Sequence, residues 1–348
     1  MAANLPRIGI TLGDPAGVGP ELVLRWLAAP AWRERVCPVI YGSTTLLHRV
    51  AQAIHVPWPD DLQVLPASLA GHTFPRARAP LLLDFPFPEA ATLVPGRVQV
   101  PCGRMAATWV ECATRDARAG SLAGLVTGPI NKEAIHLAGV PYPGHTEMLA
   151  ALTGASSTAM LFWSPDLIVS LATIHLSLAE VPAALTMERV LDTIRLTAAA
   201  CVRFGRANQP IAVLALNPHA GENGLFGREE ARVIAPAIVA ANTEGIPAIG
   251  PLVPDVAFTA ERRAAHAAYV AMYHDQGLIP FKMLAFAEGV NVTLGLPIIR
   301  TAPDHGTAFD IAWKGLADPS SLTAAILCAS RLAGSYDDKH AAHTVTPR

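Results

Sequence analysis

Three apolar runs in the chain each end in a histidine. They are DLIVSLATIH at 166–175, IAVLALNPH at 211–219 and AAYVAMYH at 267–274. Near-continuous apolar runs are typical of buried strands in a parallel sheet, and ligands bind beyond the carboxyl ends of such strands. His175, His219 and His274 are therefore predicted to form an open metal site that leaves coordination positions for substrate oxygens. The alternative is three unrelated histidines that cap helices or pack in the core.

The spacing of apolar positions predicts strands and helices that alternate along most of the chain. Predicted strands lie at 7–12, 36–43, 122–127, 158–163 and 167–174, and predicted helices at 21–29, 103–119, 187–204, 228–244 and 321–332, with a further helix starting after the turn GPINK at 128–132. Thr186 is the expected N-cap of the helix at 187–204. This alternation predicts an α/β fold with a mostly parallel sheet and right-handed crossovers.

Two segments carry no periodic signal. The stretch from 55 to 95 is rich in proline and alanine and predicts loops and short irregular strands. The polar end at 335–348 is expected to fray, so its His340 and His343 are not taken as a metal-binding pair.

Length and composition narrow the class of protein. The chain has 348 residues, enough for two domains or one large α/β unit. Basic and acidic residues number 26 and 28, which argues against nucleic acid or a membrane surface as a partner, because both demand a basic excess. The five cysteines are scattered and form no C-x-x-C pair, so neither a disulfide framework nor a zinc ribbon is expected. There is no signal-peptide pattern and no apolar run of about 18 residues, which predicts a cytoplasmic protein.

The stretch GDPAGVGPE at 13–21 resembles a phosphate-binding loop. It lacks the Lys-Ser/Thr of a P-loop and does not fit G-x-G-x-x-G. A tight glycine turn before a helix is the simpler interpretation, and no Rossmann fingerprint occurs elsewhere.

A set of polar residues is predicted to bind an anionic substrate. PYPGHTE at 141–147 places His145 and Thr146 where a helix opens, and free N–H groups there suit a phosphate or carboxylate. With Lys282, Asn291 and Arg300 they could clamp a dianionic phosphate, arginine adding bidentate geometry. The alternatives are that Thr146 simply caps the helix and that the charged residues are solvated at the surface.

These motifs together resemble the 4-hydroxythreonine-4-phosphate dehydrogenase family of vitamin B6 biosynthesis. The similar stretches are GDPAGVGPE, GLVTGPINKEAIHLAGVPYPGHTE, NPHAGENGLFGREE, AMYHDQGLIPFK and GVNVTLGLPIIRTAPDHGTA, in that order between residues 7 and 332. The resemblance identifies the family more firmly than the substrate, because relatives oxidise other phosphorylated hydroxy acids and one branch acts on a cyclic dihydrodiol. The GHTE segment at 144–147 favours a phosphorylated substrate.

The resemblance implies a fold of the isocitrate/isopropylmalate dehydrogenase type, with two α/β domains around a central cleft. The expected domains are 1–129 plus 305–348, with the dinucleotide-binding loop, and 130–304, with the metal, substrate and dimerisation sites. It implies that His175, His219 and His274 bind a divalent cation, and that His145, Thr146, Lys282, Asn291 and Arg300 bind substrate. It also implies a homodimer with the active site at the subunit interface.

The resemblance further implies where the dinucleotide binds. HGTAFDIA at 305–312 is similar to an adenosine-binding loop of the larger relatives. His305 and Gly306 would then contact the cofactor, and Asp310 would accept the ribose hydroxyls of NAD, the alternative cofactor being NADP. Phe309 and Trp313 depart from the smaller residues common there.

The implied reaction is oxidation of a hydroxyl followed by decarboxylation of the resulting β-keto acid. A divalent ion (zinc, magnesium or cobalt) would acidify that hydroxyl and stabilise the enolate. Asp255 and Asp275 are candidates either for the base or for groups that orient the histidines, and Asp255 could equally be a plain turn residue. Two other functions remain open: a metal-dependent phosphoesterase and a non-catalytic sensor of phosphorylated metabolites.

Overall fold

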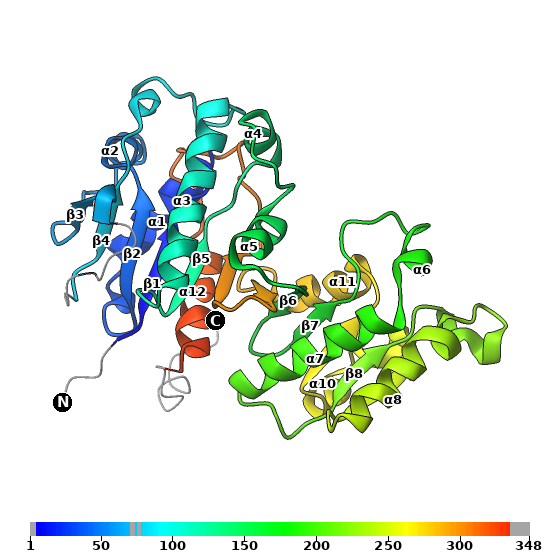
Figure 1. The fold of residues 1–348 in the computed structure, drawn as a ribbon. Coiled ribbons are helices and arrows are strands. Elements are labelled where there is room, and N and C mark those ends of the chain that lie inside the picture. The colour runs from blue at the N-terminus through cyan, green and yellow to red at the C-terminus, as the bar shows by residue number, and fades with distance from the viewer. Residues whose placement is uncertain (1–4, 70–73, 75–77, 335–348) are drawn as a thin grey trace.

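The computed structural model describes residues 5–69, 74 and 78–334 as one twelve-stranded sheet covered by helices (Figure 1). The strand order is β3-β4-β2-β1-β5-β12-β11-β6-β7-β10-β8-β9. The predicted α/β class is thereby confirmed. His340 and His343 lie outside the described residues.

Strands and helices follow one another along the chain with short connections. The strands are β1 (Arg7–Thr11), β2 (Cys37–Gly42), β3 (Gln63–Pro66), β4 (Leu81–Asp84), β5 (Gly124–Thr127), β6 (Ala159–Trp163), β7 (Ile168–Leu171), β8 (Ile211–Leu214), β9 (Ala248–Leu252), β10 (Ala268–Ala271), β11 (Val290–Leu294) and β12 (Arg300–Pro303). The α-helices are α1 (Gly19–Ala28), α2 (Thr44–Ala53), α3 (Val100–Arg118), α4 (Lys132–Leu137), α5 (His145–Thr153), α6 (Val181–Ala184), α7 (Met187–Arg203), α8 (Ala235–Thr243), α9 (Pro254–Ala257), α10 (Ala260–Ala265), α11 (His274–Ala285) and α12 (Ser320–Leu332).

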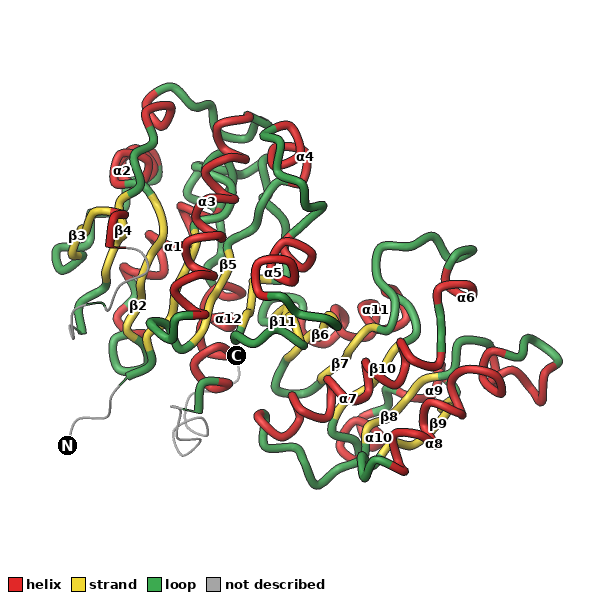
Figure 2. The backbone as a smooth tube through the Cα atoms, in the orientation of Figure 1, coloured by secondary structure: helices red, strands yellow, loops and turns green. Residues whose placement is uncertain are grey.

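The sheet is mostly parallel, as predicted. Antiparallel pairing joins β11 to β12 and β6, and β6 to β7, in the middle of the sheet. Figures 1 and 2 together show two lobes, one with β1–β5 and α12 and the other with β7–β10, and β6 lies between them. The tube in Figure 2 shows β11 next to β6 at the same junction.

Strands of the second lobe are buried on both faces, which explains their continuous apolar sequences. Val213 and Val270 belong to one hydrophobic cluster with α7 and α8. Their chain neighbours Leu214 and Tyr269 belong to a second cluster with Leu278 of α11. Because successive strand residues face opposite sides, both clusters need apolar residues without a break.

Helix ends follow local sequence signals. Thr186 caps α7 as predicted, its Oγ1 accepting a bond from Arg189 N at 3.2 Å. The predicted helix at 228–244 differs at its start, because residues Glu230–Ile234 form a π-helix before α8. No described helix combines the length and apolar character needed to cross a bilayer.

Candidate active site

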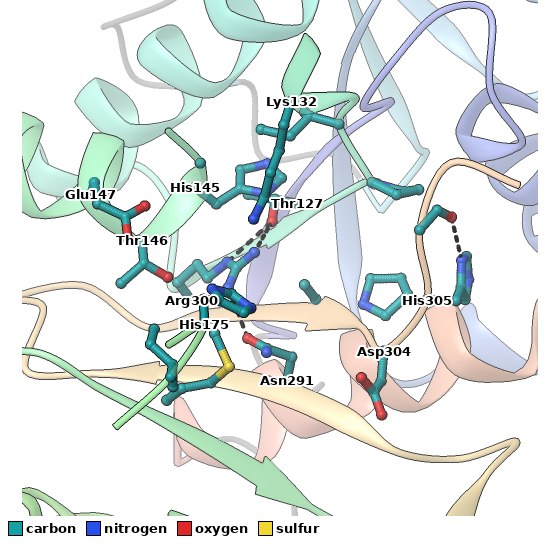
Figure 3. Close-up of a pocket in the computed structure, with 18 of the residues that line it drawn as sticks. Thr127, Lys132, His145, Thr146, Glu147, His175, Asn291, Arg300, Asp304 and His305 are labelled. Carbon is teal, nitrogen blue, oxygen red and sulfur yellow. Dashed lines mark hydrogen bonds between the residues drawn. The ribbon is translucent and has the colours of Figure 1, made fainter. Parts of the chain in front are cut away.

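A pocket of about 690 Å³ lies at the carboxyl ends of the central strands, where the two lobes meet (Figure 3). Its wall is formed by the end of β5 and the turn after it, by residues after β7, by the first residues of α4, α5 and α11, and by β6, β11, β12 and the segment after β12. The polar residues that line it are Thr127, Lys132, His145, Thr146, Glu147, His175, His274, Asn291, Arg300, Asp304 and His305.

Arg300 is a buried cation without a carboxylate partner among the described residues. Only 4 % of the residue is exposed. Its guanidinium donates to Thr127 Oγ1 at 2.7 and 3.1 Å, to Asn291 Oδ1 at 3.0 Å and to Thr293 Oγ1 at 2.9 Å. Burial lowers the pKa of Arg300 to about 10, so it stays charged at neutral pH. Neutral oxygens fix the group while its charge remains available for an anion.

His145 and Thr146 begin α5, as the sequence predicted. The helix is capped by the backbone of Gly144 with no side-chain hydrogen bond, so the interpretation of Thr146 as a plain cap is wrong. The Nε2 atom of His145 is buried and has no hydrogen-bond partner in the described structure. Burial, then the charges of Arg300 and Lys132, hold the pKa of His145 well below its usual value. A neutral imidazole and free helix N–H groups thus face the pocket beside Arg300.

His175 and His274 come together at the pocket wall. Their ring centroids are 5.8 Å apart. Burial lowers the pKa of His175, with Lys132 and His274 adding to the effect, which favours the neutral imidazole that metals bind. His274 Nδ1 lies 2.7 Å from Asp275 Oδ1, which fixes the ring and leaves Nε2 for a ligand. These two histidines fit a metal site.

His219 follows β8 as predicted but does not line this pocket. It lies in the turn Pro218–Gly224, where His219 has φ 52° and its ring packs 6.3 Å from that of Phe226. No group of three or more histidine, cysteine or acidic side chains within the described residues is placed to hold a metal ion. The third ligand of the predicted site therefore stays a prediction.

Lys282, predicted to bind substrate, is held by Asp304 rather than lining the pocket. Its Nζ forms an ion pair with the Asp304 carboxylate and donates to the Asp304 carbonyl at 2.8 Å. Burial raises the pKa of Asp304, and the Lys282 ammonium opposes that rise. The pair places a neutralised carboxylate at the pocket edge.

The two candidate bases differ in their surroundings. Asp275 is exposed and contacts His274, which agrees with an orienting group. Asp255 lies on α9, exposed and outside the pocket lining of this chain.

The predicted cofactor loop follows β12 and packs against the glycine turn after β1. His305 and Gly306 line the pocket, whereas Asp310 is exposed outside it. Val18 N donates to Thr307 O at 3.0 Å. A Cβ on Gly17 would approach that same oxygen to 3.0 Å. The glycines of GDPAGVGPE thus allow close backbone packing, in agreement with a tight turn rather than a phosphate cradle.

Lys132, Thr127, Glu147 and Asp304 line the pocket but were not selected from the sequence. Lys132 is exposed at the first residue of α4, and no hydrogen bond or ion pair to a described residue holds its Nζ. The signal that selected the histidines, a polar residue at or just after the end of an apolar strand, also applies to Thr127, the last residue of β5, and to Lys132 in the turn GPINK.

Comparison with known proteins identifies the family to which the chain belongs. The family model for pyridoxal phosphate biosynthetic protein PdxA matches residues 34–329. A 4-hydroxythreonine-4-phosphate dehydrogenase of Geobacter metallireducens is 45% identical over 96% of this chain and 97% of its own. A D-threonate 4-phosphate dehydrogenase of Pectobacterium atrosepticum is 40% identical over 94% and 99%.

A solved structure extends the match to three dimensions. The crystal structure of 4-hydroxythreonine-4-phosphate dehydrogenase from Klebsiella pneumoniae has a TM-score of 0.84 and 40% identity, covering 94% of this chain and 99% of its own. The chain therefore belongs to the pyridoxal phosphate biosynthetic protein PdxA family and is an enzyme of the oxidoreductase class.

Proposed function

We propose that this enzyme oxidises 4-phosphohydroxy-L-threonine with NAD and a divalent cation, and that the β-keto acid loses carbon dioxide to give 3-amino-2-oxopropyl phosphate for pyridoxal phosphate synthesis. The observation that carries the proposal is Arg300, a buried guanidinium at the pocket wall with no described carboxylate partner. A buried charge without a counterion destabilises the fold. An anion bound against Arg300 would supply that counterion and would explain why the charge is kept there.

The phosphate is assigned to the corner between Arg300 and the start of α5. Arg300 offers its positive charge and the one guanidinium N–H that Thr127, Asn291 and Thr293 leave unused. The helix start offers N–H groups next to Thr146. Asn291 holds the guanidinium through its Oδ1 atom. Lys282 contributes by neutralising Asp304, which would otherwise repel a phosphate at the same pocket.

The hydroxyl to be oxidised is assigned to the opposite wall, at His175 and His274. These imidazoles, joined by His219, are proposed to hold zinc, magnesium or cobalt. When bound there, a divalent cation would acidify the substrate hydroxyl and stabilise charge on the ketone oxygen. Asp275 keeps His274 oriented through the Nδ1 contact, and Asp255 remains a candidate base.

D-threonate 4-phosphate is a second candidate substrate. The relative from Pectobacterium atrosepticum that carries this name matches nearly the whole chain. The two substrates share the phosphate and the hydroxy acid, so the pocket residues above serve both. They differ at the position that bears an amino group in one and a hydroxyl in the other.

A cofactor-reduction assay tests the proposal. The purified chain is mixed with NAD, a divalent cation and either 4-phosphohydroxy-L-threonine or D-threonate 4-phosphate, and the absorbance of reduced nicotinamide is followed with carbon dioxide release. With 4-phosphohydroxy-L-threonine, both the absorbance of reduced nicotinamide and the amount of carbon dioxide released are expected to rise. Phosphate release without reduction would indicate a phosphoesterase, and binding without turnover a sensor; either outcome would refute the proposal.

Lys132 is expected to strengthen phosphate binding at the site proposed between Arg300 and the start of α5. Hydrogen bonds to charged groups contribute about 1.5–3 kcal/mol, so Lys132→Met should lower kcat/KM by roughly 10- to 150-fold. The control is the dephosphorylated substrate, on which wild type and variant should differ far less. Equal losses on both substrates would assign Lys132 to the reacting end of the substrate instead.

The segment 305–312 is proposed to bind the adenosine half of NAD. Its first residues line the pocket, and the exposed Asp310 carboxylate is free to accept ribose hydroxyls, as acidic residues do in other dinucleotide sites. The wild-type enzyme should prefer NAD, and Asp310→Ser should narrow the ratio of kcat/KM between NAD and NADP. A wild-type preference for NADP, or a ratio unchanged by the substitution, would rule out this role.

A homodimer is proposed, with α11 at its interface. Ile279, Met283 and Phe286 follow helical spacing and are 60, 82 and 79 % exposed, an apolar face larger than scattered surface residues account for. The same helix begins at His274, so dimer contacts would adjoin the active site.

Met283→Glu should therefore convert the dimer to a monomer, because a carboxylate would be buried without a partner. Mass measurement by light scattering after size exclusion provides the test. Val202→Glu, at an exposed position of α7, is the matched control and should leave the mass unchanged. A monomeric wild type, or a Met283→Glu variant that stays dimeric, would contradict this interface.

A further inference from the structure

Buried side chains that do not line the substrate pocket tie together the three strand ends that carry His175, His219 and His274. The strands β7, β10 and β8 are neighbours in the sheet. Two polar side chains, Thr173 and Gln276, bridge their carboxyl ends, and both are buried.

Thr173 joins the end of β7 to the end of β10. Its Oγ1 donates to Met272 O at 2.7 Å, and its backbone N donates to the same oxygen at 3.2 Å. Thr173 lies two residues before His175, and Met272 two residues before His274. The bond therefore sets the distance between the backbones that carry these two histidines.

Gln276 joins the end of β10 to the end of β8. Its Oε1 accepts from Met272 N at 2.7 Å, and its Nε2 donates to Ala215 O at 2.7 Å. Both ends of the amide are used, so one side chain fixes the spacing between the β10 and β8 ends. A continuous series of bonds thus runs from Thr173 through Met272 and Gln276 to the segment before His219.

Glu230, the first residue of the π-helix, fixes that segment from the other side. Its Oε1 accepts from Leu216 N at 2.9 Å and Asn217 N at 2.8 Å, and its Oε2 accepts from Asn217 Nδ2 at 3.0 Å. A Cβ on Gly221 would lie only 2.7 Å from the same Oε2. The turn that carries His219 is therefore packed directly on the Glu230 carboxylate.

The backbone conformation at the histidines requires such support. His175 has φ 47°, and residues 219–223 all have positive φ. The left-handed conformation is unfavourable for an L-residue, and such strain persists only where the surroundings over-determine it. The bonds of Thr173, Gln276 and Glu230 meet this requirement.

We propose that Thr173, Gln276 and Glu230 form a strand-end bracket whose function is to set the relative positions of the three histidine-bearing turns and hence the affinity for the divalent cation. The inference rests on the metal role in the proposed function. The three are positioning residues: they act on the histidine backbones and contact neither substrate nor ion.

Cobalt titration of the metal-free full-length chain, followed calorimetrically, tests the bracket without any measurement of turnover. Loss of a group that orients metal ligands typically lowers affinity about 10- to 100-fold. Gln276→Met, which keeps the length and removes both bonds, should weaken cobalt binding by this amount. Thr173→Val should do the same, whereas Thr173→Ser keeps the hydroxyl and should bind like wild type.

Asn242→Leu is the matched control. The Asn242 amide also bridges backbone groups, donating to Ala248 O at 2.9 Å, but at the amino end of β9, away from the histidines. The Asn242→Leu substitution should lower the unfolding temperature. It should leave the cobalt dissociation constant within about twofold of the wild-type value, a difference of roughly 0.4 kcal/mol in binding free energy.

The outcomes separate the two hypotheses. Wild type that binds no cobalt overturns the metal role and the bracket together. Wild type that binds, with Gln276→Met and Thr173→Val binding equally well, overturns the bracket alone. Equal weakening by Asn242→Leu, or by Thr173→Ser, also overturns it, because the effect would then follow general stability.

Discussion

Replacement of Arg300 by alanine should lower kcat/KM for the phosphorylated hydroxy acid by roughly 30- to 800-fold. Loss of a charge-assisted bond to a buried dianion costs about 2–4 kcal/mol, and about 1.4 kcal/mol corresponds to a tenfold change in rate. The upper part of the range is expected, because Arg300 is buried and no described carboxylate shares its charge. Steady-state kinetics with excess NAD gives the measurement.

Two comparisons isolate the phosphate contact. The substrate without its phosphate should lose much less on the same substitution, and equal losses would show that Arg300 has another role. Arg300→Lys keeps the charge but loses the fork that reaches Thr127, Asn291 and Thr293, so it should recover part of the activity. Since Thr127 and Thr293 are buried around the guanidinium, the unfolding temperature of each variant is measured alongside.

Replacement of His274 or His219 by alanine should abolish measurable turnover and weaken binding of the divalent cation. Charge stabilisation by a metal contributes several kcal/mol, and a loss of about 4 kcal/mol corresponds to a rate lower by roughly 10³-fold. Cobalt affinity and turnover are measured on the same preparations. His219 is the stricter test, because within this chain it lies outside the pocket that His175 and His274 line.

His266→Ala is the matched control for the histidine substitutions. His266 is buried, whereas His219 is exposed and His274 half-buried; its Nδ1 lies 3.3 Å from Tyr269 Oη, and it has no place in the pocket. It should change stability without changing cobalt affinity. Unchanged cobalt affinity in both His219→Ala and His274→Ala would remove the metal site from the proposed function.

The elements predictable from sequence are those whose apolar pattern has a single structural explanation. Strand β8 and helix α7 are examples: β8 is buried on both faces, and α7 shows helical spacing after a threonine cap. Strands β11 and β12 escaped prediction because they contain Asn291, Thr293 and Arg300, polar residues directed at one another and at the pocket. Local sequence rules fail where strands carry a functional site.

The residues of the candidate site also fall into those that could be predicted from sequence and those that could not. His175 and His274 could be paired from sequence because each follows a strand, and the ends of neighbouring parallel strands meet. Lys132 carries the same kind of signal, a polar residue in the turn that follows a strand, but only the folded chain shows that this turn borders the same pocket as the start of α5. The engagement of Lys282 by Asp304 depends on two segments 22 residues apart and leaves no local trace.

One sheet that runs through both lobes has a consequence for how the molecule resists aggregation. Its outermost strands each contain a proline, Pro66 in β3 and Pro251 in β9. Proline lacks the N–H needed for a further strand to add at an exposed edge. A fragment that contained only one lobe would instead end at the middle of the sheet, where β11 is now hydrogen-bonded to β12 and β6. That newly exposed edge would present unpaired backbone N–H and C=O groups to other copies of the fragment, so each lobe depends on the other to cover its inner edge.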